Sequence, residues 1–423
     1  MAHLGYQSKE MNAFREMLRE NDSLRRKQKR DTEFAGRREI DLNKFCGTKP
    51  SLADIEEIAL RLKRKAGGIK CRHKDLCSLQ IALSFSGEGF GEAFVKIDGA
   101  LPALIRDLSG QDSTLQLRAT YCCANLALDG MNVGLKVAKA AAPYLMTHLK
   151  GMNQILLEAS LWAVGSLSGS GVPACKVLEV QGIYPQIITI MHRYHPTLHT
   201  ASPLQENSKT KAQEIRVIEA VLYAAAHCIT TGLTNNISSS EIAMLTAAAI
   251  PLLDRSDSNF LGRLMYLFFI VSCSEFSEVV FLEANFVDKI VLLMDEILVM
   301  ETEGYAKSSN NGFSMQILTF IIRILGNICS SERGRLKFES ISEVLCPIMN
   351  NLMKALPYLP LHLLKETLWF AMQLLKPYAT WSNGILQICQ CPWNDITVMV
   401  NSSLELQAKK MDLGAAVLTT QIR

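Results

Sequence analysis

One short phrase returns along this chain, and its spacing limits the fold more than any single segment does. Each copy has an aromatic residue or an arginine followed, four positions later, by a polar residue, set among apolar and small residues. Successive copies start 41, 61, 43, 57 and 46 residues apart. They begin at Tyr121, Trp162, Tyr223, Tyr266, Arg323 and Trp369, and the copy at Tyr266 is degenerate. A chain with such a period builds one similar unit per copy, and each unit buries its apolar face against its neighbours.

The units predicted by this period are helical. From residue 51 onwards apolar residues recur at three- and four-residue spacing, and no alternating strand pattern stands between turn signals. Two polar interruptions, at 193–213 and 301–313, fall in the two long intervals and read as flexible insertions. Helical repeats of about 40–47 residues are typical of armadillo and HEAT arrays. We therefore expect an all-α, armadillo-repeat, right-handed superhelical solenoid with about seven repeats over 51–396 and a cap over 397–423.

Residues 1–50 differ from the rest because they carry much charge and little apolar surface. A segment of this composition cannot build a core alone, so we expect a flexible arm. Its cations gather in two groups, first Arg25, Arg26, Lys27, Lys29 and Arg30, then Arg37 and Arg38. The plain interpretation is a solvated tail, and the sharper one is a basic peptide that binds an acidic partner surface.

An aromatic and a polar residue four positions apart share one face of a helix. Stacked repeats would align several such pairs along a concave groove. The polar group can hydrogen-bond the backbone of an extended peptide, while the rings flank the stems of lysine or arginine and attract their charge. The alternative is that the aromatic residues only pack in the core, as rings at helical spacing usually do. The paired polar residues favour the groove interpretation. In the core each of them would need a hydrogen-bond partner, whereas in a groove a bound peptide can supply one.

The copies at Trp162, Arg323 and Trp369 resemble armadillo repeats of the importin-α family. The resemblance is carried by Glu158-Ala-Ser-Leu-Trp162-Ala-Val-Gly-Ser166, by Arg323-Ile-Leu-Gly-Asn327 and by Lys365-Glu366-Thr-Leu-Trp369-Phe-Ala-Met-Gln373. In the arm, Leu24-Arg-Arg-Lys-Gln-Lys-Arg30 with Arg37 and Arg38 is similar to the family's importin-β-binding segment. Arm and repeats occur in the family's order, from about residue 11 to about residue 395.

The resemblance implies a nuclear import adaptor that works in cytoplasm and nucleus. Its groove would bind the basic nuclear-localisation peptides of cargo proteins, and both groups of arm cations would bind importin-β. By position, the principal peptide site would hold Tyr121, Asn125, Trp162, Ser166, Tyr223 and His227. A second site would hold Arg323, Asn327, Glu366, Trp369 and Gln373. Ser170 stands where the family has an acid for the cargo lysine, and Asp129 has the equivalent offset one repeat earlier.

Catalytic and metal motifs are absent from the sequence. It has no phosphate-binding glycine loop, dinucleotide fingerprint or nucleophile elbow, so we expect no enzyme activity and no cofactor. His192, His195 and His199 have ligand chemistry, but Pro196 interrupts their helix and no carboxylate or cysteine completes a metal set. The twelve cysteines include no CxxC pair, which favours free thiols in a reducing compartment. The most apolar stretches are short or contain charges, so no membrane span is predicted.

Two other uses of these features stay open. The arm's cations would also attract nucleic-acid phosphates, but few aromatic residues are interleaved with them, so nucleic acid ranks below a protein partner. The other alternative is a non-transporting armadillo scaffold that binds one dedicated protein partner, with the arm left as a vestige or a localisation signal.

Overall fold

The computed structural model describes residues 49–375 apart from nine short gaps. The gaps are 65–67, 86–88, 195–207, 234–236, 255–259, 275–276, 283–284, 305–310 and 356–360. The predicted arm, except for its last two residues, and the predicted cap lie outside the described residues. The chain divides into two compact units. The first comprises residues 1–190 and 204–236, and the second comprises residues 191–203 and 237–423.

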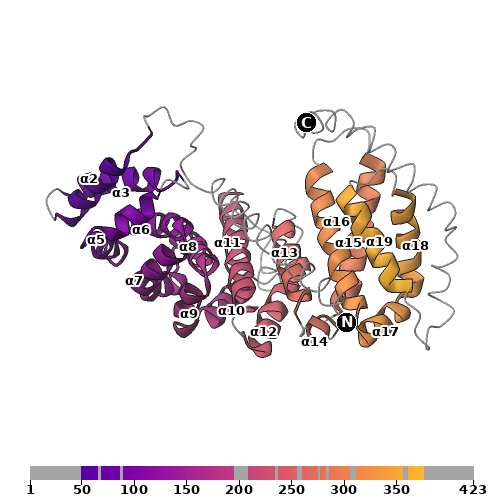
Figure 1. The fold of residues 1–423 in the computed structure, drawn as a ribbon. Coiled ribbons are helices and arrows are strands. Elements are labelled where there is room, and N and C mark those ends of the chain that lie inside the picture. The colour runs from indigo at the N-terminus through magenta and orange to yellow at the C-terminus, as the bar shows by residue number, and fades with distance from the viewer. Residues whose placement is uncertain are drawn as a thin grey trace, which may run out of the picture. The chain divides into compact units, whose positions relative to one another are not determined.

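The first unit is a stack of helices (Figure 1). Its helices are α2 Leu52–Lys63, α3 Ile69–Ala82, α4 Phe90–Lys96, α5 Ala100–Leu108, α6 Ser113–Leu126, η2 Ala127–Asp129, α7 Met131–Lys150, α8 Gln154–Ser170, α9 Val172–Val180, α10 Ile183–Arg193 and α11 Ser208–Leu233. One row runs α3, α6, α8, α11, each helix packed on the next, and α5, α7 and α9 form a second row against it. The copies at Tyr121, Trp162 and Tyr223 therefore lie on consecutive helices of one row.

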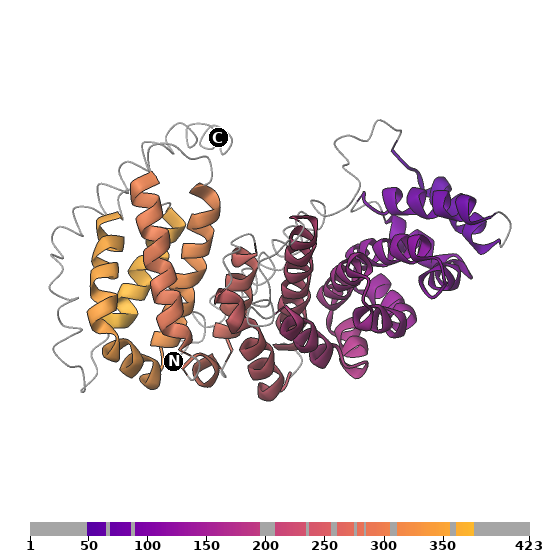
Figure 2. The same cartoon turned by 180° about the vertical axis from the view of Figure 1, so that it is seen from behind.

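The second unit repeats this plan. Its helices are α12 Ser239–Ala249, η4 Ile250–Asp254, α13 Leu261–Ser272, α14 Ser277–Leu282, α15 Phe286–Gly304, α16 Asn311–Cys329, α17 Glu332–Ser340, α18 Ser342–Ala355 and α19 Leu361–Leu375. One row is α13, α16, α19, while α15 packs on α18 and α14 on α17. The orange and yellow helices of this unit are seen from behind in Figure 2. The copies at Tyr266, Arg323 and Trp369 again fall on consecutive helices of a row.

Local sequence signals fix where the helices of these rows begin. The Asp112 carboxylate accepts hydrogen bonds from Thr114 N and Leu115 N at the start of α6. Asn153 does the same for Ile155 N and Leu156 N at the start of α8. Such side chains satisfy amide groups that a helix leaves without partners at its first turn. Gly130, with φ of 116°, joins η2 to α7 in a conformation that strongly favours glycine.

The two polar insertions are shorter than the sequence predicted. The segment 193–213 was predicted as a loop, but α11 already begins at Ser208. The segment 301–313 was also predicted as a loop, yet α15 continues to Gly304 and α16 begins at Asn311. Lys, Ala and Gln in 209–213 are good helix formers, and Gln213 is tied to α8 by a hydrogen bond to Glu158, so the helix extends beyond the apolar pattern.

The described residues contain helices and turns and no strand, as expected for an all-α chain. Their nine cysteines are free thiols. No single helix among them has the length and apolar composition to cross a membrane, although Ser314–Cys329 and Glu332–Ser340, bent by 115°, pass that test as a pair.

Candidate peptide-binding site

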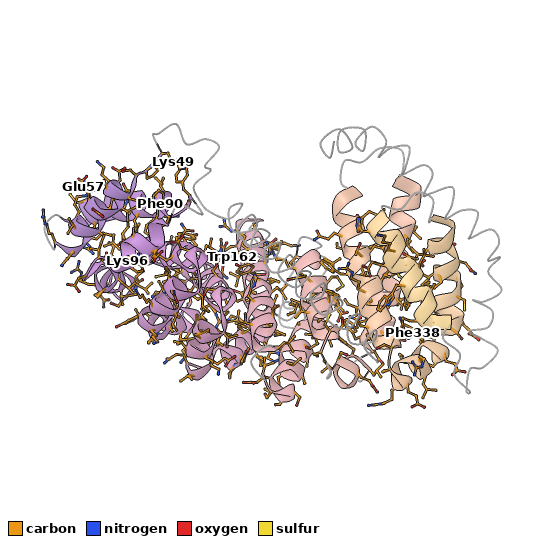
Figure 3. All side chains as sticks on the ribbon, viewed as in Figure 1. Lys49, Glu57, Phe90, Lys96, Trp162 and Phe338 are labelled. Carbon is orange, nitrogen blue, oxygen red and sulfur yellow. The ribbon has the colours of Figure 1, made fainter. Side chains whose placement is uncertain are left out.

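The structure brings the predicted residues of the principal site together in the first unit. Trp162 on α8 and Tyr223 on α11 have ring centroids 4.4 Å apart, and Tyr223 makes an edge contact of 4.4 Å with His227. Trp162 lies well inside the first unit (Figure 3). The rings of Tyr121, Trp162 and Tyr223 are buried, and His227 is half-buried. The phrase thus brings the rings of α8 and α11 into contact, and all three aromatic rings pack in the core.

A glycine in the phrase makes room for this contact, and the sequence reasoning did not single it out. Gly165 stands three positions after Trp162, and a Cβ atom there would lie 2.5 Å from Tyr223 Cδ1. The same relation recurs in the second unit, where a Cβ at Gly326 would lie 2.1 Å from Trp369 Cζ3. Each ring therefore rests against the helix backbone of the preceding repeat. The signal was present in the sequence as a glycine just before the polar residue of two copies.

The polar residues of the phrase bond with neighbouring repeats. Asn125 Nδ2 donates to the carbonyl oxygen of Gln80 at 3.1 Å and to Ser84 Oγ at 3.2 Å, both on or just after α3. Ser166 Oγ lies 3.3 Å from the Tyr223 hydroxyl. The Asn125 Oδ1 atom is buried and accepts no hydrogen bond, so a buried acceptor is left over in this row. Such an atom is costly unless a ligand or water donates to it.

Two carboxylates stand one helical turn before the rings of the first unit, and these were not predicted as site residues. Glu158 precedes Trp162 by four positions, and Glu219 precedes Tyr223 by four, so each pair shares a helix face. Both acids are buried. Glu158 accepts hydrogen bonds from Gln213 Nε2 at 2.9 Å and Arg216 Nε at 3.1 Å, both on α11. The signal was the acid at this offset in two consecutive copies.

Asp129, the acid that the sequence offers as compensation for Ser170, bonds the neighbouring helix α4. Its carboxylate accepts a hydrogen bond from Glu92 N at 2.7 Å in the first turn of α4. The side chain also lies against Gly91, where a Cβ would be 2.7 Å from Asp129 Oδ2. Asp129 therefore caps α4, because the η2 turn aims it back at that helix. The acids beside the rings are Glu158 and Glu219 instead.

The predicted second site is assembled in the second unit around an arginine. Arg323 Nη2 on α16 bonds Glu366 Oε1 on α19 at 2.5 Å, and the Arg323 guanidinium lies 5.4 Å from the centre of the Phe269 ring on α13. Asn327 Nδ2 donates to Ser272 Oγ at 2.9 Å. Trp369 rests on α16 as described, and Gln373 is buried one turn later on α19. All five predicted residues thus lie on two adjacent helices, α16 and α19.

The arm cations and the histidine cluster are the remaining features that the sequence singled out. The cations of the arm lie outside the described residues, as do His195 and His199. Among the residues that are described, no group of three or more His, Cys, Asp and Glu side chains is placed to hold a metal ion.

Comparison with known proteins places the fold. No protein-family model matches the chain. An engineered protein of known structure matches with a TM-score of 0.55 at 14% identity, covering 83% of this chain and 82% of its own. A designed armadillo repeat protein matches at 15% identity and a TM-score of 0.47, covering 64% of this chain and 99% of its own. Another, solved in complex with the peptide (KR)4, matches at 14% identity, with 63% and 99% covered and the same TM-score. The predicted all-α fold of stacked helical repeats is confirmed by the helices of the described residues and by the match at a TM-score of 0.55.

Proposed function

We propose that this chain is a protein-binding adaptor that holds an extended, basic segment of a partner along the α6, α8 and α11 row. One observation carries the proposal: an acid stands four residues before an aromatic ring on each of two adjacent helices. The pairs are Glu158 with Trp162 and Glu219 with Tyr223, and the two rings touch. Repeats stacked in this way offer the same chemistry at regular intervals along a row.

The chemistry of these pairs fits lysine and arginine side chains. The rings themselves are buried, so the stem of a bound lysine or arginine would lie on the helix surface beside them, near enough for the rings to attract its cation. A carboxylate one turn away on the same helix face then receives the charged tip. In the second unit, Glu366 stands three positions before Trp369 and adds a third acid near a ring in the sequence.

In its finer form the proposal is a nuclear import adaptor of the importin-α kind. The arm's cations, Arg25 to Arg30 with Arg37 and Arg38, would bind importin-β, and the row would bind the nuclear-localisation peptides of cargo. Such a protein works in cytoplasm and nucleus. The support for this form is the order of arm and repeats in the sequence, together with acids and rings in the row.

Two assays test the proposal. Fluorescence anisotropy with a labelled peptide of four Lys-Arg pairs tests the row, and Glu158→Gln should weaken binding severalfold. A pull-down of purified importin-β with the full chain tests the arm. Replacing Arg26, Lys29 and Arg30 together by Ala should abolish capture, while the control triple of Lys9, Arg15 and Arg19 to Ala should keep it. Capture that survives the first triple contradicts the import form of the proposal.

A second candidate is a scaffold for one dedicated partner that transports nothing. The observation in its favour is that the polar residues of the phrase are occupied. Asn125, Ser166 and Asn327 all bond side chains or backbone of adjacent repeats. Polar side chains that are engaged in this way are less free to hydrogen-bond a peptide backbone, which suits one dedicated partner. Peptide binding without importin-β capture would select this scaffold.

A further inference from the structure

The acids beside the rings already hold cations of the protein itself. In the first unit, the Glu158 carboxylate is paired with Arg216 Nε at 3.0 Å. In the second unit, Glu366 is paired with Arg323. These are two of the places where a partner's lysine or arginine would dock under the proposed function, and each is filled from a neighbouring helix of the same unit.

We propose that Arg216 and Arg323 are selectivity gates, each of which a basic ligand must displace from its carboxylate before it can bind. This inference rests on the proposed function and adds the residues that decide which basic segments are accepted. A segment with one cation would gain little, because it only exchanges one ion pair for another. A segment whose stem also lies on the helix surface beside a ring gains more than it displaces.

Exposure in the first unit fits a gate that opens. The Glu158 side chain is only 4% exposed, whereas the Arg216 side chain is 45% exposed. The Glu158 carboxylate is buried and accepts hydrogen bonds from both Gln213 and Arg216, so leaving it without a donor is unfavourable. The Arg216 side chain is nearly half exposed, so water can solvate its guanidinium when another cation takes its place. Gln213 stays on the other carboxylate oxygen and keeps the acid oriented.

The second unit also has an arginine that occupies the acid near a ring, but there the arginine belongs to the repeated phrase itself. Arg323 takes the position that an aromatic residue holds in the other copies, and its side chain is 35% exposed against 22% for Glu366. The guanidinium lies over the Phe269 ring, so the arginine occupies both halves of a cation site, the ring and the acid. Arg216 reaches its acid from the repeat after it in the chain, and Arg323 reaches its acid from the repeat before it. Both arginines therefore occupy an acid that a basic ligand would need.

A structural ion pair and a gate predict opposite changes in binding. If Arg216 only ties α11 to α8, then Arg216→Gln lowers stability and leaves affinity for a basic peptide equal or lower. If Arg216 is a gate, the same change frees a carboxylate that seeks a cation, and affinity rises. A peptide that no longer competes with a partly exposed ion pair gains up to about 1 kcal/mol, which corresponds to about fivefold tighter binding.

The experiment measures binding of a labelled peptide of four Lys-Arg pairs to the full chain at fixed ionic strength. The variants are Arg216→Gln, Arg323→Gln and the double variant Glu158→Gln with Arg216→Gln. The control is Arg333→Gln, which removes an exposed arginine of another ion pair, with Glu278 on α14. Each gate variant should bind about fivefold tighter. The double variant should lose the gain, and the control should match the wild type.

The outcomes separate this inference from the proposed function. Peptide binding by the wild type with no gain in either arginine variant overturns the gates and leaves the proposed function standing. Binding that appears only in the arginine variants supports the gates and shows that the wild type does not hold this class of peptide. Absence of binding in every folded protein overturns both. Because the two gates lie in separate units, a folding failure of one variant leaves the other as the test.

Discussion

The ring of Tyr223 rests on the α8 backbone at Gly165, so close that a Cβ atom on this glycine would lie 2.5 Å from the ring. The Cα of Ala224 would lie 3.1 Å from the same Cβ. The packing of this ring therefore depends on a missing side chain. The relation is tight because the contacting atoms are a ring and a backbone atom, neither of which can bend aside as a flexible tip can.

Gly165→Ala should destabilise the first unit although alanine is the better helix former. Alanine gains up to about 1 kcal/mol in a helix interior, while forcing extra volume into a packed site costs about 1–3 kcal/mol. The net effect is a lower midpoint in urea unfolding. A double-mutant cycle with Tyr223→Ala checks the cause, because the loss should fall towards zero when the ring is absent. An equal loss in both backgrounds contradicts the contact.

Asn125→Ala should cost more than Asn327→Ala. The first change leaves the Gln80 carbonyl and Ser84 Oγ without the Asn125 donor at a buried site, for which about 1–3 kcal/mol is expected. Asn327 is half-buried, so water can replace its bond to Ser272 and the loss should stay near 1 kcal/mol or below. Urea unfolding of both variants measures the difference. Similar losses would show that burial does not decide the cost here.

Acid should weaken the first unit through His148. Burial lowers the pKa of this imidazole below its ordinary value of 6.5. The unfolded chain therefore takes up a proton at pH values where the folded His148 stays neutral. Stability is fully present above pH 6.5 and falls as the pH drops from 6.5 towards the folded pKa. Melting temperatures of the wild type and His148→Gln across this range check it, and the variant should show the shallower decline.

Thiol labelling should divide the cysteines of the first unit sharply. Cys71 is exposed, whereas Cys122 and Cys123 are buried. Burial raises the pKa of Cys123 to about 12, so almost no thiolate forms near neutral pH. A maleimide reagent on the native chain, read by peptide mass mapping, should modify Cys71 quickly and the buried pair only after unfolding. Comparable native rates at Cys71 and Cys123 would contradict the packing around α6.

The sequence predicted the rows better than it predicted their chemistry. Helical spacing and the recurring phrase are local, so they located Tyr121, Trp162 and Tyr223 on adjacent helices correctly. The partners of Glu158 lie 55 and 58 residues later in the chain, and no local pattern connects them. The bond of Asp129 to α4 was not predicted either, because its direction depends on the η2 turn and on the packing of α4.

The start of α11, near the first polar insertion, was missed for the same reason. Polar residues at 208–213 read as a loop when taken alone, but Gln213 and Arg216 find a carboxylate on α8. A tertiary contact thus extends α11 beyond the point where its apolar pattern ends. Composition cannot show this, because the contact belongs to two segments of the chain at once.

The seat of Tyr223 on Gly165 also restricts how this array can change by descent. When a repeat is duplicated or exchanged within the gene, its aromatic ring contacts the neighbouring repeat, which must then have a glycine at the contact position. Substitutions at position 165 are therefore expected to depend on the residue at position 223, and substitutions at position 326 on the residue at position 369. Lineages that enlarge one residue of a pair are expected to have reduced the other, so the history of each repeat is recorded in the repeat beside it.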